Sequence, residues 1–177
     1  MKSRIVLVTG GARSGKSRYA EERAGKAGRR LLYVATAEAR DEEMARRIAD
    51  HRARRGGAWL TVEEPVEITR RLLEQRGKVD AALVDCLTLW VSNLLLRGDE
   101  KAARTAVEEL AENTREINFP LFLVTNEVGW GIVPDNPLAR AFRDLTGWTS
   151  QRLAAAADEV VLMVAGVPMI VKGRACD

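Results

Sequence analysis

The sequence predicts an α/β fold in which a mainly parallel sheet is covered by helices on both faces and ends in an antiparallel edge hairpin. Four short runs are rich in aliphatic side chains at odd and even positions alike: residues 4–9, 31–36, 81–85 and 121–126. Strands buried on both faces show this pattern, and the long connections between the runs leave room for crossover helices. Residues 58–64 predict one more short strand.

The hairpin is predicted from the C-terminal stretch EVVLMVAGVPMIVKG. Two strand-like halves are joined there around Ala165 and Gly166, and glycine is typical of tight hairpin turns. The chain has 177 residues, a length that suits one hydrophobic core, and it contains no internal repeat or linker. We therefore expect a single domain over residues 1–177.

Composition excludes several functional classes. The chain is 46% hydrophobic and 30% charged, which is ordinary for a globular protein. Its net charge is only +3 and basic residues alternate with acidic ones, so general nucleic-acid binding is not expected. Cys86 and Cys176 are the two cysteines and lie far apart, which favours a reducing cytoplasm over a disulfide framework. No apolar run is long enough for a membrane span or a signal peptide.

A glycine-rich motif follows the first predicted strand and precedes a helical pattern. It matches G-x-x-x-x-G-K-[ST] over Gly10, Gly11, Ala12, Arg13, Ser14, Gly15, Lys16 and Ser17. Glycines allow backbone N–H groups to converge on phosphate oxygens at the start of a helix. In such loops the lysine reaches the β- and γ-phosphates and the serine hydroxyl binds Mg²⁺. The alternative is a strand-to-helix turn with a chance Gly-Lys-Ser.

A second candidate is Asp85, the last residue of a predicted strand. A carboxylate at the carboxyl end of a parallel strand beside a phosphate loop is well placed to hold Mg²⁺. An ordinary helix-capping role is the alternative. Together Lys16, Ser17 and Asp85 predict a site for a nucleoside triphosphate with magnesium.

The one histidine, His51, lies in the stretch DEEMARRIADHRARR. Acidic residues at its start and arginines at its end are typical of a helix, in which Met44, Ile48 and His51 share one stripe. Two interpretations stay open from the residues alone. His51 is either a packed histidine beside a solvated charged face, or a nucleophile that attacks a nucleotide phosphorus while arginines stabilise the charge.

At this point the chain resembles the bifunctional adenosylcobinamide kinase / adenosylcobinamide-phosphate guanylyltransferase family of cobalamin biosynthesis. The resemblance runs nearly end to end. The stretches that carry it are GGARSGKS, YVATAEARDEEMARRIADHRARR, WLTVEEP, LVDCLTLWVSNLL and TNEVGWGIVPDNPLARAFRDLTGWTSQRLAAAADEVVLMVAGVP. With the glycine-rich loop, it implies a P-loop NTPase fold, a RecA-like three-layer sandwich.

The resemblance implies two reactions, with GTP or ATP and Mg²⁺ as the expected nucleotides and metal. A nucleoside triphosphate first phosphorylates the hydroxyl of adenosylcobinamide. GTP then transfers GMP to the enzyme, releasing pyrophosphate, and the GMP passes to adenosylcobinamide phosphate to give adenosylcobinamide-GDP. The resemblance further implies a cytoplasmic homo-oligomer, a trimer, that acts on a small corrinoid and neither spans a membrane nor binds nucleic acid.

The family's functional positions transfer to this sequence residue by residue. The histidine that carries GMP falls on His51, and Lys16 is the catalytic lysine of the loop. Ser17 and Asp85 are the expected metal ligands. Besides Gly10 to Ser17, the nucleotide contacts fall on Ala35, Thr36, Ala37, Arg52, Ala53, Arg54, Arg55, Glu63 and Asp85.

The stretch NEVGWGIVPDNP follows a predicted strand and contains Trp130, Ile132 and Val133. Exposed apolar residues of this kind are costly unless something covers them. The segment either folds back onto the core or lies in a subunit interface, or else it forms a wall for the corrin substrate.

Two competing functions remain open. A plain P-loop kinase would transfer phosphate without a covalent intermediate. A RecA-like ATPase acting on nucleic acid or a protein partner is the other, although no basic stripe or aromatic platform supports DNA binding.

Overall fold

The structure, a computed structural model, describes residues 4–39, 41–42, 45–46, 49 and 56–173. Its strands are β1 (Ile5–Gly10), β2 (Leu31–Ala35), β3 (Trp59–Glu63), β4 (Ala81–Asp85), β5 (Leu121–Val124), β6 (Glu159–Val164) and β7 (Val167–Lys172). Its helices are α1 (Lys16–Gly25), α3 (Ile68–Glu74), α4 (Leu87–Arg97), α5 (Glu100–Asn113) and α6 (Pro137–Ala156), with short 3₁₀ turns η1 (Gly56–Ala58) and η2 (Thr114–Glu116).

The strands form one seven-stranded sheet in the order β3-β2-β4-β5-β1-β6-β7. Every neighbouring pair is parallel except β6 and β7, which form an antiparallel hairpin at the edge. Ala165 and Gly166 make its turn, both with positive φ. The predicted parallel sheet, the extra strand near residues 58–64 and the C-terminal hairpin are therefore confirmed, with strand ends shifted by one or two residues.

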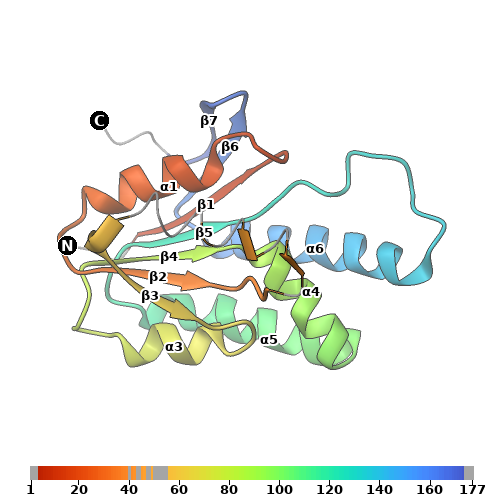
Figure 1. Ribbon diagram of the computed structural model, residues 1–177, viewed down its shortest axis with the longest axis horizontal. Coiled ribbons are helices and arrows are strands. Elements are labelled where there is room, and N and C mark those ends of the chain that lie inside the picture. The colour runs from red at the N-terminus through yellow and green to blue at the C-terminus, as the bar shows by residue number, and fades with distance from the viewer. Residues whose placement is uncertain (1–3, 40, 43–44, 47–48, 50–55, 174–177) are drawn as a thin grey trace.

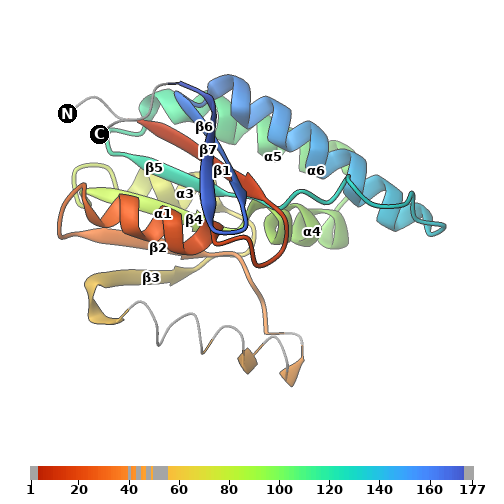
Figure 2. The same ribbon diagram turned by 90° about the horizontal axis from the view of Figure 1, so that it is seen from above.

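Helices cover both faces of the sheet, as Figures 1 and 2 show, with α1 on one face and α3, α4, α5 and α6 on the other. The strand β1 explains why, because its side chains alternate between two separate cores. Ile5 and Leu7 pack in the larger core with α4, α5 and α6, whereas Val6 and Val8 pack in the smaller core beneath α1. A strand with apolar residues on both sides needs such cover on both sides. None of the helices in the described ranges is both long and apolar enough to cross a membrane.

Local residues explain where several helices begin. Asn136 caps α6 with its side-chain oxygen, which accepts from the N–H groups of Leu138 and Ala139, and Pro137 occupies the first turn. Asp99 caps α5 in the same way. Trp90 on α4 is buried, as expected for a core residue, and its indole N–H donates to the Val66 carbonyl at 2.7 Å.

A buried ion-pair cluster joins α1 to the amino edge of the sheet. Glu159, the first residue of β6, is fully buried and its Oε2 lies 2.6 Å from an Arg4 guanidinium nitrogen. Arg23, near the end of α1, contacts both oxygens of the same carboxylate, and its guanidinium lies 5.8 Å from the centre of the Phe122 ring. One fully buried carboxylate thus pairs with two partly buried arginines.

We expect Glu159→Gln to destabilise the fold strongly, because it leaves two guanidinium groups without their anion. Removing one partner of a buried pair costs about 3–5 kcal/mol. Urea denaturation measures the change. Glu22→Gln is the matched control, since Glu22 pairs with Arg18 at 2.8 Å on the exposed side of α1 and should leave stability unchanged. Similar midpoints for the two variants would show that the cluster contributes little.

Candidate nucleotide site

The glycine-rich loop connects the end of β1 to the start of α1, as predicted. Its backbone takes conformations that favour glycine, with φ of 148° at Gly10 and 94° at Gly15. Gly10 is also constrained by space. A Cβ at this position would lie 2.5 Å from the Met163 carbonyl oxygen on β6 and 2.8 Å from Ser14 Oγ. No other residue fits there without moving backbone.

Hydrogen bonds hold the loop from the two strands that flank β1. On one side Gly166, in the β6–β7 turn, donates its N–H to the Ser14 carbonyl at 3.1 Å. On the other side Glu127, just beyond β5, donates its N–H to the Gly10 carbonyl at 3.0 Å. The loop is therefore fixed by neighbours from both ends of the sequence, and its shape does not depend on its own residues alone.

Lys16 is the first residue of α1, and its side chain turns back into the loop. It is 94% buried, and its Nζ donates to the Gly11 carbonyl at 2.6 Å and lies 3.4 Å from Ser14 Oγ. Burial lowers the pKa of Lys16, while the charges of Cys86, Asp85 and Glu127 act to raise it. An ammonium group at a helix N-terminus inside a loop of N–H groups suits a multiply charged anion such as a nucleotide polyphosphate.

The Cys86 thiol plays no part as an anion at neutral pH. Burial is the main cause that raises its pKa to about 12, so it is a neutral thiol there. The negative charges that act on Lys16 near neutral pH are therefore those of Asp85 and Glu127.

Asp85 ends β4 at the carboxyl edge of the sheet, as predicted. Its Oδ2 accepts the Tyr33 hydroxyl hydrogen bond at 2.8 Å, which fixes the carboxylate and leaves Oδ1 directed elsewhere. Asp85 pairs with Ala35 on β2 and with Val124 on β5. Ser17 lies in the first turn of α1 and is partly exposed. Carboxylate and hydroxyl oxygens are ligands that suit Mg²⁺. Within the described ranges, no group of three or more His, Cys, Asp or Glu residues could by itself hold a metal ion.

The predicted contacts after β2 lie at the same edge. Ala35 and Thr36 are buried, and Ala37 is partly exposed. The Thr36 hydroxyl donates to the Cys86 carbonyl and accepts from the Cys86 N–H, both at 2.8 Å. Thr36 thus ties β2 to β4, and only Ala37 offers accessible surface for a nucleotide.

The other predicted residues lie farther away or outside the described ranges. Glu63 is exposed at the end of the edge strand β3, which β2, β4 and β5 separate from β1. His51 and the four residues Arg52, Ala53, Arg54 and Arg55 lie outside the described residues. They belong to the connection between β2 and β3, which leaves the sheet at the carboxyl edge of β2.

One residue beside the loop was not predicted. The Thr9 hydroxyl donates to Glu127 Oε1, and the Glu127 backbone already contacts Gly10. The sequence signal was present, since Glu127 directly follows the predicted strand 121–126, much as Asp85 ends the predicted strand 81–85. Its importance depends on strand order, which places β5 between β4 and β1.

The segment between β5 and α6 reaches out beyond the sheet (Figure 1). Trp130 is 73% exposed and Ile132 97% exposed, so these side chains do not pack on the core of their own chain. Two arginines of α6 anchor the segment: Arg143 donates to the Gly129 carbonyl at 2.9 Å, and Arg140 to the Pro134 carbonyl at 2.9 Å. A held apolar segment remains compatible with a subunit interface or with a wall for a substrate.

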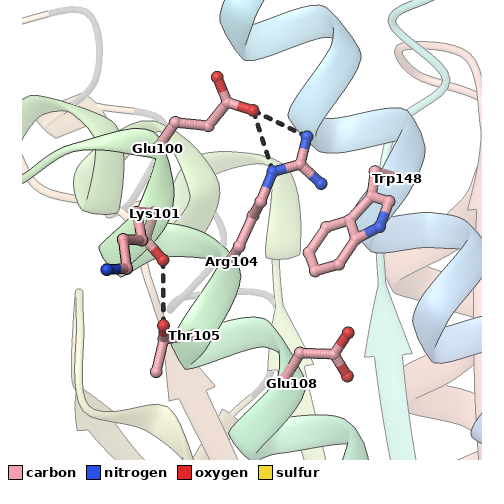
Figure 3. Close-up of a pocket in the computed structure, with 6 residues that line it drawn as sticks. All are labelled: Glu100, Lys101, Arg104, Thr105, Glu108 and Trp148. Carbon is pink, nitrogen blue, oxygen red and sulfur yellow. Dashed lines mark hydrogen bonds and ion pairs between the residues drawn. The ribbon is translucent and has the colours of Figure 1, made fainter.

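A shallow pocket of about 640 Å³ lies elsewhere, between α5 and α6 (Figure 3). The Arg104 guanidinium lies 4.5 Å from the centre of the Trp148 ring and 2.7 Å from Glu100, and Glu108 pairs with Arg152. These charges neutralise one another, and the pocket is on the face of the sheet opposite α1. It is not a polyphosphate site.

We expect Gly10→Ala to weaken nucleotide binding at least about tenfold, because the added methyl group displaces the β6 carbonyl or Ser14 and opens the loop. Titration with a fluorescent GTP analogue measures this. Gly147→Ala is the control, since this residue lies in α6, away from the loop, and a Cβ there has no neighbour within 4 Å; it should bind as the wild type does. Equal affinities for all three proteins would show that the close approach of β1 and β6 is not needed.

Comparisons with known proteins place the chain in a family. The model of the family "Cobinamide kinase / cobinamide phosphate guanyltransferase" matches residues 6–171. The bifunctional adenosylcobalamin biosynthesis protein CobP of Pseudomonas aeruginosa is 46% identical over 168 residues, which cover 95% of this chain and 97% of that protein. The bifunctional adenosylcobalamin biosynthesis protein CobU of Salmonella typhimurium is 43% identical over 181 residues, which cover 95% of this chain and 99% of that protein.

A solved structure supports the fold. The KaiC-like protein PH0186 from Pyrococcus horikoshii OT3 aligns with a TM-score of 0.57 at 16% identity, covering 98% of this chain and 81% of that one. The predicted P-loop NTPase fold is confirmed. The chain belongs to the cobinamide kinase / cobinamide phosphate guanyltransferase family and is an enzyme of that kind.

Proposed function

We propose that the enzyme phosphorylates adenosylcobinamide with ATP or GTP and then transfers GMP from GTP to adenosylcobinamide phosphate through a guanylyl-histidine on His51. The products of the second reaction are adenosylcobinamide-GDP and pyrophosphate. The observation that carries the proposal is the loop around buried Lys16, which lies at the carboxyl edge of the sheet in a chain of this family. Open α/β sheets bind their ligands at that edge.

In the kinase step the hydroxyl oxygen of the substrate attacks the γ-phosphorus, and the bond from that phosphorus to the leaving nucleotide breaks. Lys16 lies at the start of α1, where the β- and γ-phosphates are proposed to bind, so its charge would offset the charge that develops on the transferred group. The backbone N–H groups between Gly11 and Ser17 add fixed dipoles. Ala37 and Glu63 are proposed contacts for the rest of the nucleotide, with Ala35 and Thr36 behind them.

Ser17 and Asp85 are the proposed ligands of Mg²⁺. The chemistry of these donors fits that metal, and Mg²⁺ is commonly held by one or two side chains together with substrate phosphates. When bound, Mg²⁺ neutralises charge on the β- and γ-phosphates. The Tyr33 hydroxyl keeps the Asp85 carboxylate oriented through its hydrogen bond of 2.8 Å.

In the guanylyl step an imidazole nitrogen of His51 attacks the α-phosphorus, and the bond to the pyrophosphate leaving group breaks. A phosphate oxygen of adenosylcobinamide phosphate then attacks the same phosphorus and releases the histidine. Arg52, Arg54 and Arg55 are proposed to stabilise the charge on the phosphoryl oxygens, and Ala53 to contact the nucleotide. The sequence contains no second histidine that could replace His51.

The corrinoid is proposed to bind on the same side as the loop, and the enzyme to work in the cytoplasm as a homo-oligomer, a trimer. The exposed Trp130, Ile132 and Val133 support either role of their segment, since they supply anchored apolar surface. A plain P-loop kinase remains the competing function, and labelling of the protein separates the two.

GTP labelled at the α-phosphorus should leave label on the denatured protein, whereas label at the γ-phosphorus should not. The adduct should survive alkali and vanish in mild acid, because protonation of the imidazole makes it a good leaving group. His51→Ala should lose the adduct and guanylyl transfer but keep kinase activity, since phosphate transfer needs no covalent intermediate. Denaturing electrophoresis detects the label.

Acid-labile α-label that persists on the His51→Ala protein would contradict the assignment. Kinase activity without any labelled wild-type protein would favour the plain kinase. Equal loss of both activities in His51→Ala would point to a structural role for the histidine.

A further inference from the structure

The kinase step requires a proton acceptor, because the attacking group is an alcohol. The hydroxyl must lose its proton as the new oxygen–phosphorus bond forms, and a positioned carboxylate usually takes it. Five carboxylates of the described residues lie at the carboxyl end of a parallel strand or within three residues beyond it: Glu38, Glu63, Glu64, Asp85 and Glu127.

Four of the five are poorly suited to this role. Glu38 forms an ion pair with Arg97 at the end of α4. Glu63 and Glu64 lie at or just beyond the end of β3, at the far side of the sheet from the loop, and Glu64 pairs with Arg71 at 3.0 Å. Asp85 accepts the Tyr33 hydroxyl and is the proposed metal ligand. A carboxylate in a direct ion pair, or one that would bind a metal ion, is a weak proton acceptor.

Glu127 differs in its position and in its partners. It follows β5, the strand next to β1, and its backbone N–H binds the Gly10 carbonyl at 3.0 Å. Its Oε1 accepts from the Thr9 hydroxyl, and the described residues supply no further hydrogen bond to Oε2. Lys16 interacts electrostatically with Glu127 as well as with Asp85. Glu127 therefore lies beside the lysine that should hold the γ-phosphate, with one carboxylate oxygen fixed and the other available.

We propose that Glu127 is the proton acceptor of the kinase step. The inference rests on the proposed function. The substrate hydroxyl gives its proton to Glu127 Oε2 while its oxygen bonds to the γ-phosphorus and the nucleoside diphosphate leaves with the electrons of the broken bond. Thr9 is a positioning residue, because its hydroxyl holds Oε1 and so sets the direction of the carboxylate.

The guanylyl steps need no such base. A neutral imidazole attacks through a nitrogen lone pair and has no proton to lose from that atom. The second acceptor is a phosphate oxygen, which already carries negative charge near neutral pH. Loss of the Glu127 carboxylate should therefore separate the two activities, whereas loss of nucleotide binding would remove both.

The test compares wild type, Glu127→Gln, Glu127→Asp and Thr9→Val in two assays: phosphate transfer from ATP to adenosylcobinamide, and labelling of the protein by α-labelled GTP. Glu127→Gln keeps the size of the side chain but not its basicity. Its kinase kcat should fall at least about a hundredfold, the usual contribution of a general base, while labelling changes by less than about threefold. Thr9→Val should reduce kcat by a smaller factor.

The pH profile separates a base from a structural role. For the wild type, kinase kcat should fall toward acid pH, because a general base accepts a proton only in its unprotonated form. Lys16 on α1 interacts electrostatically with Glu127, and it also interacts with Asp85 on β4. Cys86 lies near the same lysine, but its thiol is neutral near neutral pH. Glu127→Gln should lose this acid limb, and Glu127→Asp and Thr9→Val should keep it.

Three results would overturn the assignment. The first is a Glu127→Gln kinase rate within about threefold of wild type. The second is an equal loss of kinase activity and labelling, which would make Glu127 part of nucleotide binding. The third is an acid limb that persists in Glu127→Gln. Wild-type protein that becomes labelled but transfers no phosphate to adenosylcobinamide would contradict the proposed kinase function itself, and this role with it.

Discussion

The carboxyl end of β1 passes so close to β6 that a Cβ on Gly10 would lie 2.5 Å from the Met163 carbonyl oxygen. This approach determines where the chain turns. With no side chain at position 10, the backbone leaves the sheet at a positive φ. The loop then surrounds the side chain of Lys16, the first residue of α1. The Gly166 N–H and the Glu127 N–H then hold the loop from the two neighbouring strands. The proposed phosphate site thus depends on three adjacent strands.

The strand order decides which charges meet at this loop. Because β5 lies between β1 and β4, Glu127 stands directly beside the loop and Asp85 one strand farther away. Lys16 is buried, which lowers its pKa, and the two carboxylates oppose that effect. Two acidic groups from different strands act on the same ammonium group, which allows them different roles, one toward a metal and one toward a proton. The cluster of Glu159 with Arg4 and Arg23 lies at the other end of the strands and serves stability.

The sequence was sufficient for the parts of the fold that rest on local patterns. Residues 81–85 alternate between two buried faces, so the strand could be predicted. Gly10 and Gly15 are required by local backbone geometry, so the loop could be predicted too. The position of Glu127 beside the loop could not be predicted. It depends on the pairing of β5 with β1, a contact between residues about a hundred positions apart. Asp85 was predicted because the loop motif leads one to seek a carboxylate at the end of a neighbouring strand. His51 was assigned by resemblance alone, and its place in the structure is outside the described residues.

The central claim is that one phosphate loop serves both reactions. The sequence holds a single match to the loop motif, and in the described part of the chain Lys16 lies inside it. The most direct measurement is competition: a non-hydrolysable ATP analogue is titrated against labelling of the enzyme by α-labelled GTP, with nucleotide stoichiometry measured by calorimetry. A shared loop predicts that the analogue abolishes labelling competitively, with one nucleotide bound per chain. Undiminished labelling with both nucleotides bound at once would contradict it.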